Sequence, residues 1–171
     1  TIKIKSYAKL NLSLNVIKKK PQKLHIIESL ITFVNFYDTI YIKETKASKH
    51  KIKFIGNFSK NITQNNTVNT LLNLLDEKKL LQEKKFEIKI IKNIPQKSGM
   101  GGGSMNASSI IKFFLKKKII TLSKKNLNSI METIGSDVPI GMNSKNTILS
   151  KTGRLTVKEK KLGLYTLIVK P

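Results

Sequence analysis

The chain has 171 residues, of which 39% are hydrophobic, with a formal net charge of +23 at pH 7 and no cysteine. This length is enough for one domain with its own core, and the lack of cysteine excludes disulfides, thiolate metal ligands and a cysteine nucleophile. No apolar run is long enough to cross a bilayer, and the N-terminal residues lack the apolar core of a signal peptide. We therefore expect a cytoplasmic protein without membrane insertion.

The positive charge leaves two classes of function open. A strongly basic chain is typical of proteins that bind nucleic acids. Here, however, Arg154 is the only arginine, and the lysines are spread along the chain among isoleucines and asparagines. Arginine recognises bases and phosphates more specifically than lysine does. The charge thus indicates a basic surface and does not decide whether that surface binds anything.

The first part of the chain has the period of β-strands. Residues 2–6 alternate, and residues 7–16 alternate again, with leucines on one face and Lys9 and Asn11 on the other. By spacing alone, such a lysine is an ordinary solvated side chain. Residues 18–23 form a polar turn, and residues 24–42 read as one or two further strands. His25 lies in this apolar stretch, where a lone histidine is more typical of a structural role than of a metal ligand.

A strand over residues 52–56 and a polar loop up to residue 66 come next. Val68, Leu71, Leu72 and Leu75 follow helical spacing, which predicts a helix from Asn66 towards residue 79. Asparagine is a preferred N-cap, so Asn66 is the expected cap of this helix. Residues 86–90 then alternate as another strand.

Four of the nine glycines lie within residues 99–103, between that strand and a helical pattern at residues 107–114. Glycine permits positive φ and close backbone approach, and the N–H groups at a helix N-terminus attract anions. The segment therefore has the properties of a phosphate-binding loop, although a glycine-rich turn that serves only packing is the alternative. It is not a Walker A loop, because Gly103 is followed by Ser104 and Met105 rather than by lysine and a hydroxyl residue. It also lacks the third glycine of the dinucleotide and protein-kinase loops.

The last third contains one carboxylate in a suggestive position. Residues 123–133 predict an amphipathic helix that leads to Asp137 in the segment G-S-D-V-P. Phosphoryl transfer to an alcohol needs a carboxylate near the acceptor hydroxyl, but an aspartate before valine and proline is equally typical of a turn. Residues 147–150, 155–157 and 164–169 read as three more strands.

Three segments together resemble the GHMP kinases, most closely the 4-diphosphocytidyl-2-C-methyl-D-erythritol kinases. They are S-Y-A-K-L-N-L at residues 6–12, P-Q-K-S-G-M-G-G-G-S at 95–104 and G-S-D-V-P at 135–139, in the order and at the separations of the family. The resemblance covers essentially the whole chain. It implies an α+β fold, with a GHMP-kinase N-terminal domain of mixed β-sheet packed against helices at residues 1–160. Residues 161–171 are expected to be the first strand of a truncated C-terminal domain.

The resemblance also implies roles for individual residues. Asp137 would be the catalytic base, and Lys9 would hold it ionised and stabilise developing charge. ATP would be bound through Pro95, Gly99, Met100, Gly101, Gly102, Gly103 and Ser104, with Asn66 in the adenine pocket and Mg²⁺ offsetting the phosphate charge. Asn11 and His25 would contact the acceptor, His25 at the cytosine ring. No protein metal ligands are expected, and the oligomeric state is left open.

Three departures from the family pattern affect the expected function. Tyr7 replaces a proline, Met105 replaces a second serine, and Leu24 replaces the aromatic residue that stacks on the cytosine. The loss at Leu24 removes one face of the base pocket. We expect ATP-dependent phosphorylation of the 2-hydroxyl of 4-diphosphocytidyl-2-C-methyl-D-erythritol. The alternatives are a GHMP kinase for another small alcohol, and a basic RNA-binding module of related fold.

Overall fold

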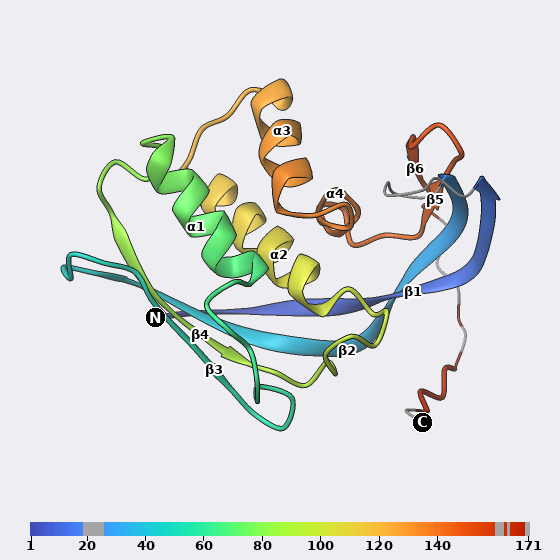
Figure 1. Cartoon of the computed structure of the whole chain (residues 1–171), viewed down its shortest axis with the longest axis horizontal. Helices are drawn as coiled ribbons and strands as arrows, with labels where there is room; N and C mark the ends of the chain where they lie inside the picture. Colours follow the sequence, from blue (N-terminus) through green and yellow to red (C-terminus); the bar gives the residue numbers. More distant parts are fainter. Residues whose placement is uncertain (19–25, 160–162, 164, 170–171) are drawn as a thin grey trace.

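The computed structural model describes residues 1–18, 26–159, 163 and 165–169. It contains one mixed sheet with all four helices on one of its faces (Figure 1). The strands are β1 (Ile2–Lys18), β2 (Ile26–Thr45), β3 (Lys51–Ile55), β4 (Lys85–Ile91), β5 (Thr147–Leu149) and β6 (Leu155–Val157). The helices are α1 (Thr67–Glu77), α2 (Gly102–Lys116), α3 (Lys124–Ile134) and α4 (Val138–Gly141). The predicted α+β fold class is confirmed.

The long strand β2 organises the sheet. It pairs with β1 along its length, with β4 through its C-terminal part and with β5 through its N-terminal part, each time antiparallel. The parallel neighbour of β4 is β3, and β6 closes the other end beside β5. The two strands predicted within residues 2–16 are one strand, because the register shift between Tyr7 and Lys9 interrupts the alternation without ending the pairing.

Two segments complete the comparison with the expected strands. Within the predicted strands at residues 24–42, the described part forms one strand from Ile26 onwards, and Leu24, His25 and the predicted turn at 19–23 lie outside the described residues. The described residues 165–169 form no strand, since none of the described strands pairs with them. The domain boundary near residue 160 stays a prediction.

The core lies between the sheet and the helices. Helical spacing correctly predicted the buried face of α1, and strand alternation that of β4. Phe114 of α2 packs on Phe86 of β4 with ring centroids 4.8 Å apart. Fully buried side chains of this size each contribute about 1.5–3 kcal/mol. The largest are Phe86, Phe114, Ile31, Ile40, Leu71, Leu72, Leu75, Leu81, Ile88, Ile90, Ile94 and Met105. Among the described residues, no helix is long and apolar enough to cross a membrane.

A buried ion pair joins β2 to the segment that follows β4. The carboxylate of Asp38, which is fully buried, accepts a hydrogen bond from Nζ of Lys92. Its other oxygen accepts from the backbone N–H groups of Asn93, at 2.8 Å, and of Ile94, at 2.9 Å. Because the glycine-rich loop begins directly after Ile94, this carboxylate fixes where the loop leaves the sheet.

We predict that Asp38→Ala strongly destabilises the fold. The change leaves a buried ammonium and two backbone donors unpaired, and breaking a buried pair in this way costs about 3–5 kcal/mol. The free energy of unfolding measured by urea denaturation checks this value. Glu159→Ala is the control, because Glu159 pairs with Lys145 at the surface, where an ion pair contributes about 0–1 kcal/mol. Equal losses for the two variants would contradict the structural role of Asp38.

Candidate active site

The glycine-rich loop ends in the N-terminus of α2. Gly99 and Gly101 have φ of +72° and +68°. Residues with a side chain are strained in this region of backbone conformation. Gly101 is the N-cap, and the first helical hydrogen bond runs from N–H of Met105 to the carbonyl of Gly101 at 2.8 Å. The N–H groups of Gly102, Gly103 and Ser104 precede that bond and have no acceptor within the helix. They are available to an anion.

The helix begins earlier than the sequence pattern suggested. Apolar spacing was visible only from residue 107, whereas α2 starts at Gly102. The glycines in its first turn are helical because that turn needs no apolar side chains: it borders a cavity rather than the core. The helix N-terminus and the glycine-rich loop are therefore one structural unit.

A cavity of about 500 Å³ lies beside this unit. Its lining comes from β1, β3, the loop before α1 and the start of that helix, the segment from Lys92 through the glycine-rich loop into α2, and Asp137 before α4. Predicted site residues in the lining are Lys9, Asn66, Pro95, Gly99, Gly101, Gly102, Gly103, Ser104 and Asp137. Of the residues predicted to contact ATP, only Met100 is missing from the lining. Its side chain is buried against Ala8 and Ile94, and its carbonyl accepts from the N–H of Lys9 at 3.1 Å, so Met100 ties the loop to β1.

Lys9 and Asp137 meet at the edge of the cavity. Nζ of Lys9 lies 3.3 Å from Oδ2 of Asp137, although the two residues are far apart in sequence. Lys9 is only 7% exposed, so it is not the solvated lysine that its spacing alone would indicate. The side chain of Asp137 is 34% exposed and directly precedes α4. An ammonium beside a partly exposed carboxylate is a combination that can stabilise an anion and accept a proton.

Gly101 packs directly against this pair. A Cβ at Gly101 would lie 3.0 Å from Cγ of Lys9 and 3.6 Å from Oδ2 of Asp137. The three segments that the sequence analysis singled out therefore converge at one point, where the helix N-terminus, the lysine and the carboxylate are in contact. Only a residue without a side chain fits there.

Of the two residues predicted to contact the acceptor substrate, Asn11 lies within the described residues and His25 does not. The side-chain oxygen of Asn11 accepts from Nζ of Lys9 at 2.7 Å, and its Nδ2 donates to the hydroxyl of Ser29 at 2.6 Å. Asn11 thus lies beside Lys9 but outside the lining of the cavity. His25 is outside the described residues, so its expected contact has no position here.

Asn66 caps α1, as its sequence position predicted. Its side-chain oxygen accepts from the N–H groups of Val68 and Asn69, both at 3.1 Å, and its Nδ2 donates to the carbonyl of Thr63 at 2.8 Å. Asn66 also lines the cavity. The start of α1 therefore forms one wall of the site.

Thr67, Lys92 and Asn106 are among the lining residues that were not predicted as site residues. The hydroxyl of Thr67 donates to the carbonyl of Gly103 at 2.8 Å, which joins the starts of α1 and α2. Lys92 lines the cavity while paired with Asp38, and Asn106 lines it with a buried Oδ1 that has no hydrogen-bond partner among the described residues. Thr67 could have been suspected from its place next to Asn66. No periodic pattern marks Lys92 or Asn106.

Comparison with known proteins gives consistent results. The sequence profile of the GHMP kinases N terminal domain matches residues 66–148. A protein of Pelagibacter ubique (strain HTCC1062) named 4-diphosphocytidyl-2-C-methyl-D-erythritol kinase is 53% identical over all 171 residues, which cover 60% of that relative. A protein of the same name from Wolbachia sp. subsp. Drosophila simulans (strain wRi) is 33% identical over 98% of the chain and 59% of its own length. The chain thus spans about 60% of the length of these curated relatives.

Solved structures share the fold. A crystal structure of 4-(cytidine 5'-diphospho)-2C-methyl-D-erythritol kinase matches with a TM-score of 0.72 at 20% identity, over 92% of this chain and 55% of that one. A crystal structure of mevalonate kinase matches with a TM-score of 0.61 at 13% identity, over 93% of this chain and 56% of that one. At such identities the likeness shows the fold alone, which is the predicted mixed sheet packed against helices.

Proposed function

Because the chain carries the N-terminal domain of the GHMP kinases, we propose that it transfers the γ-phosphate of ATP to the 2-hydroxyl of 4-diphosphocytidyl-2-C-methyl-D-erythritol. The observation that carries the proposal is the contact between Lys9, Asp137 and Gly101 at the N-terminus of α2. Phosphoryl transfer depends on positioning and on electrostatic stabilisation, and this contact offers both.

The nucleotide would lie in the 500 Å³ cavity with its phosphates over the glycine-rich loop. Free N–H groups at the start of α2 would donate to phosphate oxygens, and the helix dipole favours negative charge at this end. Asn66 and Thr67 would bound the part of the cavity that takes the nucleoside. The hydrogen bond from the hydroxyl of Thr67 to the carbonyl of Gly103 fixes the start of α1 relative to the start of α2.

The chemical step follows from the neighbours of Asp137. Its carboxylate would take the proton of the acceptor hydroxyl as the hydroxyl oxygen forms a bond to the γ-phosphorus, and the bond from that phosphorus to the leaving oxygen of ADP breaks. Lys9, 3.3 Å away, would offset the negative charge that develops on the transferred group. Nζ of Lys9 also donates a hydrogen bond to the side-chain oxygen of Asn11.

The cavity offers oxygen donors that suit Mg²⁺. The unpartnered Oδ1 of Asn106 is buried, and Ser104, two residues earlier in α2, also lines the cavity. Among the described residues, no group of three His, Cys, Asp or Glu side chains could hold a metal by itself. This fits Mg²⁺, which is usually held by few protein ligands together with substrate phosphates. Mg²⁺ would supply charge neutralisation, and Ser104 and Asn106 would be its protein contacts.

Asn66 gives a prediction that separates its cap from its proposed nucleotide contact. Asn66→Ser keeps an N-cap hydroxyl, so we expect stability to change by only a few tenths of a kcal/mol, whereas Asn66→Ala loses about 1 kcal/mol. If Asn66 also contacts the nucleotide, both variants weaken ATP binding. Thermal unfolding and calorimetric ATP titration measure the two effects. Unchanged ATP affinity in the serine variant would leave Asn66 as a cap alone.

A screen of acceptors tests the proposed substrate. ADP release would be followed with 4-diphosphocytidyl-2-C-methyl-D-erythritol, mevalonate and homoserine, because kinases named for the last two share the fold. We expect turnover only with the cytidine diphosphate compound. Turnover with another alcohol would replace the proposed substrate, and its absence with every alcohol, despite measured ATP binding, would contradict the proposed function.

A further inference from the structure

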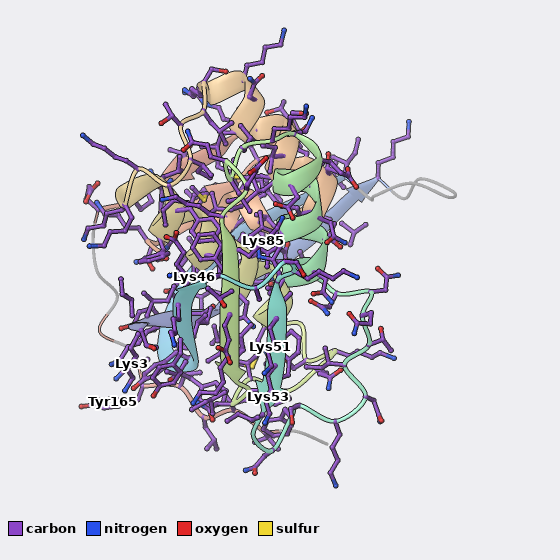
Figure 2. All side chains as sticks on the ribbon, turned by 90° about the vertical axis from the view of Figure 1, so that its left-hand side faces the viewer. Lys3, Lys46, Lys51, Lys53, Lys85 and Tyr165 are labelled. Atoms are coloured by element: carbon purple, nitrogen blue, oxygen red, sulfur yellow. The ribbon has the colours of Figure 1, made fainter. Side chains whose placement is uncertain are left out.

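The face of the sheet opposite the helices carries a group of lysines and tyrosines. We call it the outer lysine face and define it by Lys3, Lys5, Lys43, Lys51, Lys53 and Lys89 together with Tyr7, Tyr37 and Tyr41. All six lysines are exposed, and the three tyrosines are partly exposed. In Figure 2 the labelled Lys3 and Lys53 lie in the lower part of the molecule, away from the helices.

The strand register places these residues on one face. Lys3 of β1 is opposite Tyr41 of β2, which is opposite Lys89 of β4, which in turn is opposite Lys53 of β3. Residues directly opposite one another share a face of the sheet, so the four form a row across four strands, about 14 Å long at the usual strand spacing. The remaining lysines lie in the neighbouring rows.

Charge on this face is largely uncompensated. None of the six lysines forms an ion pair with an acid that the structure describes, and Glu87 is the one carboxylate in these rows. Lys85 lies in the next row, opposite Thr45, but it is paired with Asp76 and is therefore not counted in the outer lysine face. Covering six unpaired ammonium groups with neutral protein would cost their hydration. This face therefore suits either water or a partner that carries regularly spaced negative charge.

Aromatic rings lie between the cations. The ring of Tyr41 has Nζ of Lys89 at 4.8 Å and Nζ of Lys3 at 5.9 Å from its centroid, and Nζ of Lys5 lies 4.3 Å from that of Tyr37. The side-chain hydrogen bond and the charge interaction with Tyr37 raise the pKa of Lys5 above its ordinary value, which favours its charged form. Tyr7 and Tyr37 pack edge to face with centroids 5.4 Å apart.

We propose that the outer lysine face binds single-stranded nucleic acid. Ammonium groups on neighbouring strands would pair with successive phosphates, and the partly exposed tyrosines would stack on bases, as aromatic residues on sheet surfaces do in RNA-binding modules. A lipid surface fits less well, because the exposed large apolar side chains of the described residues lie outside this face, and the strength of membrane-surface binding rises with the apolar area that inserts. The outer lysine face shares no residue with the cavity lining, so the two sites can be occupied together.

Fluorescence anisotropy with labelled 12-nucleotide oligouridine and oligothymidine, between 50 and 200 mM salt, tests the proposal. We expect both to bind, with an affinity that falls with salt. Lys53→Gln combined with Lys89→Gln should reduce the slope of log K against log salt by about 1.4, since each phosphate contact contributes about 0.7 for single strands. Tyr41→Leu should weaken binding about tenfold with little change in slope, because it removes a stacking ring and no charge.

The matched control is Lys124→Gln combined with Lys125→Gln. These lysines are exposed at the start of α3, on the helix side of the molecule, and their loss changes the net charge by the same amount. We expect the control to bind like the unchanged protein, and ATP binding to be unaltered in all variants. Equal losses for the two lysine pairs would overturn the proposal by showing general charge attraction. Vesicles rich in phosphatidylserine that bind more tightly than either oligonucleotide would also overturn it.

Discussion

Asp137→Asn should lower phosphoryl transfer by about 10²–10⁴-fold while the protein stays folded and still binds ATP, because an amide cannot take the proton of the acceptor hydroxyl. The loss should appear in kcat more than in the KM for ATP. Stability should change little, since the ion pair with Lys9 involves a carboxylate that is 34% exposed and such pairs contribute about 0–1 kcal/mol. Steady-state kinetics together with thermal unfolding measure both quantities.

Asp76→Asn is the matched control for this experiment. Asp76 is also paired with a lysine, Lys85, at 2.6 Å, and its side chain is 30% exposed, but it lies away from the cavity. Its variant should retain ordinary turnover. A folded Asp137→Asn protein with nearly unchanged kcat would remove Asp137 from the proposed role of base.

Gly101→Ala should have an effect of similar size through geometry alone. Its φ of +68° strains any residue with a side chain, at a cost of about 1–2 kcal/mol. The new methyl group would also lie 3.0 Å from Cγ and 3.3 Å from Cε of Lys9, so the side chain of Lys9 must shift beside Asp137. A displacement of about 1 Å in an active site can cost about 10²-fold in rate. We expect a loss of turnover that approaches this size, measured in the same assay.

Gly99→Ala separates displacement from strain. Gly99 has nearly the same φ, +72°, but a Cβ there meets nothing within 4 Å. Gly99→Ala should therefore lose about as much stability as Gly101→Ala, but its loss of turnover should be much smaller. Equal losses of turnover at Gly99 and Gly101 would show that loop strain, rather than the contact with Lys9, sets the rate.

Local signals in the sequence were enough for much of this fold. The spacing of apolar residues located α1, and alternation located the buried side of β4, because each element buries one face against a single neighbour. The glycine cluster was recognisable for a different reason: positive φ at Gly99 and Gly101 restricts the residue type directly. The cap at Asn66 follows the same logic, since its side chain bonds to the N–H groups of the adjoining turn.

Features that depend on long-range pairing were not accessible in this way. The break in alternation near Tyr7 was read as a boundary between strands, whereas β2 continues alongside and holds β1 together across the register shift. The pairing of Asp38 with Lys92 joins residues 54 positions apart, and the sequence around each residue contains no pattern that predicts its burial. Proximity of Lys9 to Asp137 was expected only through the family resemblance, because spacing alone favoured a solvated lysine and a turn aspartate.

The outer lysine face shows the same limit for charge. Composition gave a net charge of +23 but not its distribution. Alternation places every second residue of a strand on the same face. The sequence therefore predicts that Lys3 and Lys5 share a face, and that Lys51 and Lys53 do so too. Only the strand order brings these pairs beside Tyr41 and Lys89.

Phosphorus-31 NMR of the complete reaction tests the central claim most directly. The protein would be incubated with ATP, Mg²⁺ and 4-diphosphocytidyl-2-C-methyl-D-erythritol, and the products would be followed over time. If the site formed by Lys9, Asp137 and the glycine-rich loop performs the proposed transfer, a new phosphomonoester resonance coupled to the methylerythritol unit grows in step with ADP. Formation of ADP with inorganic phosphate alone, or unchanged ATP under conditions in which ATP is bound, would contradict the account.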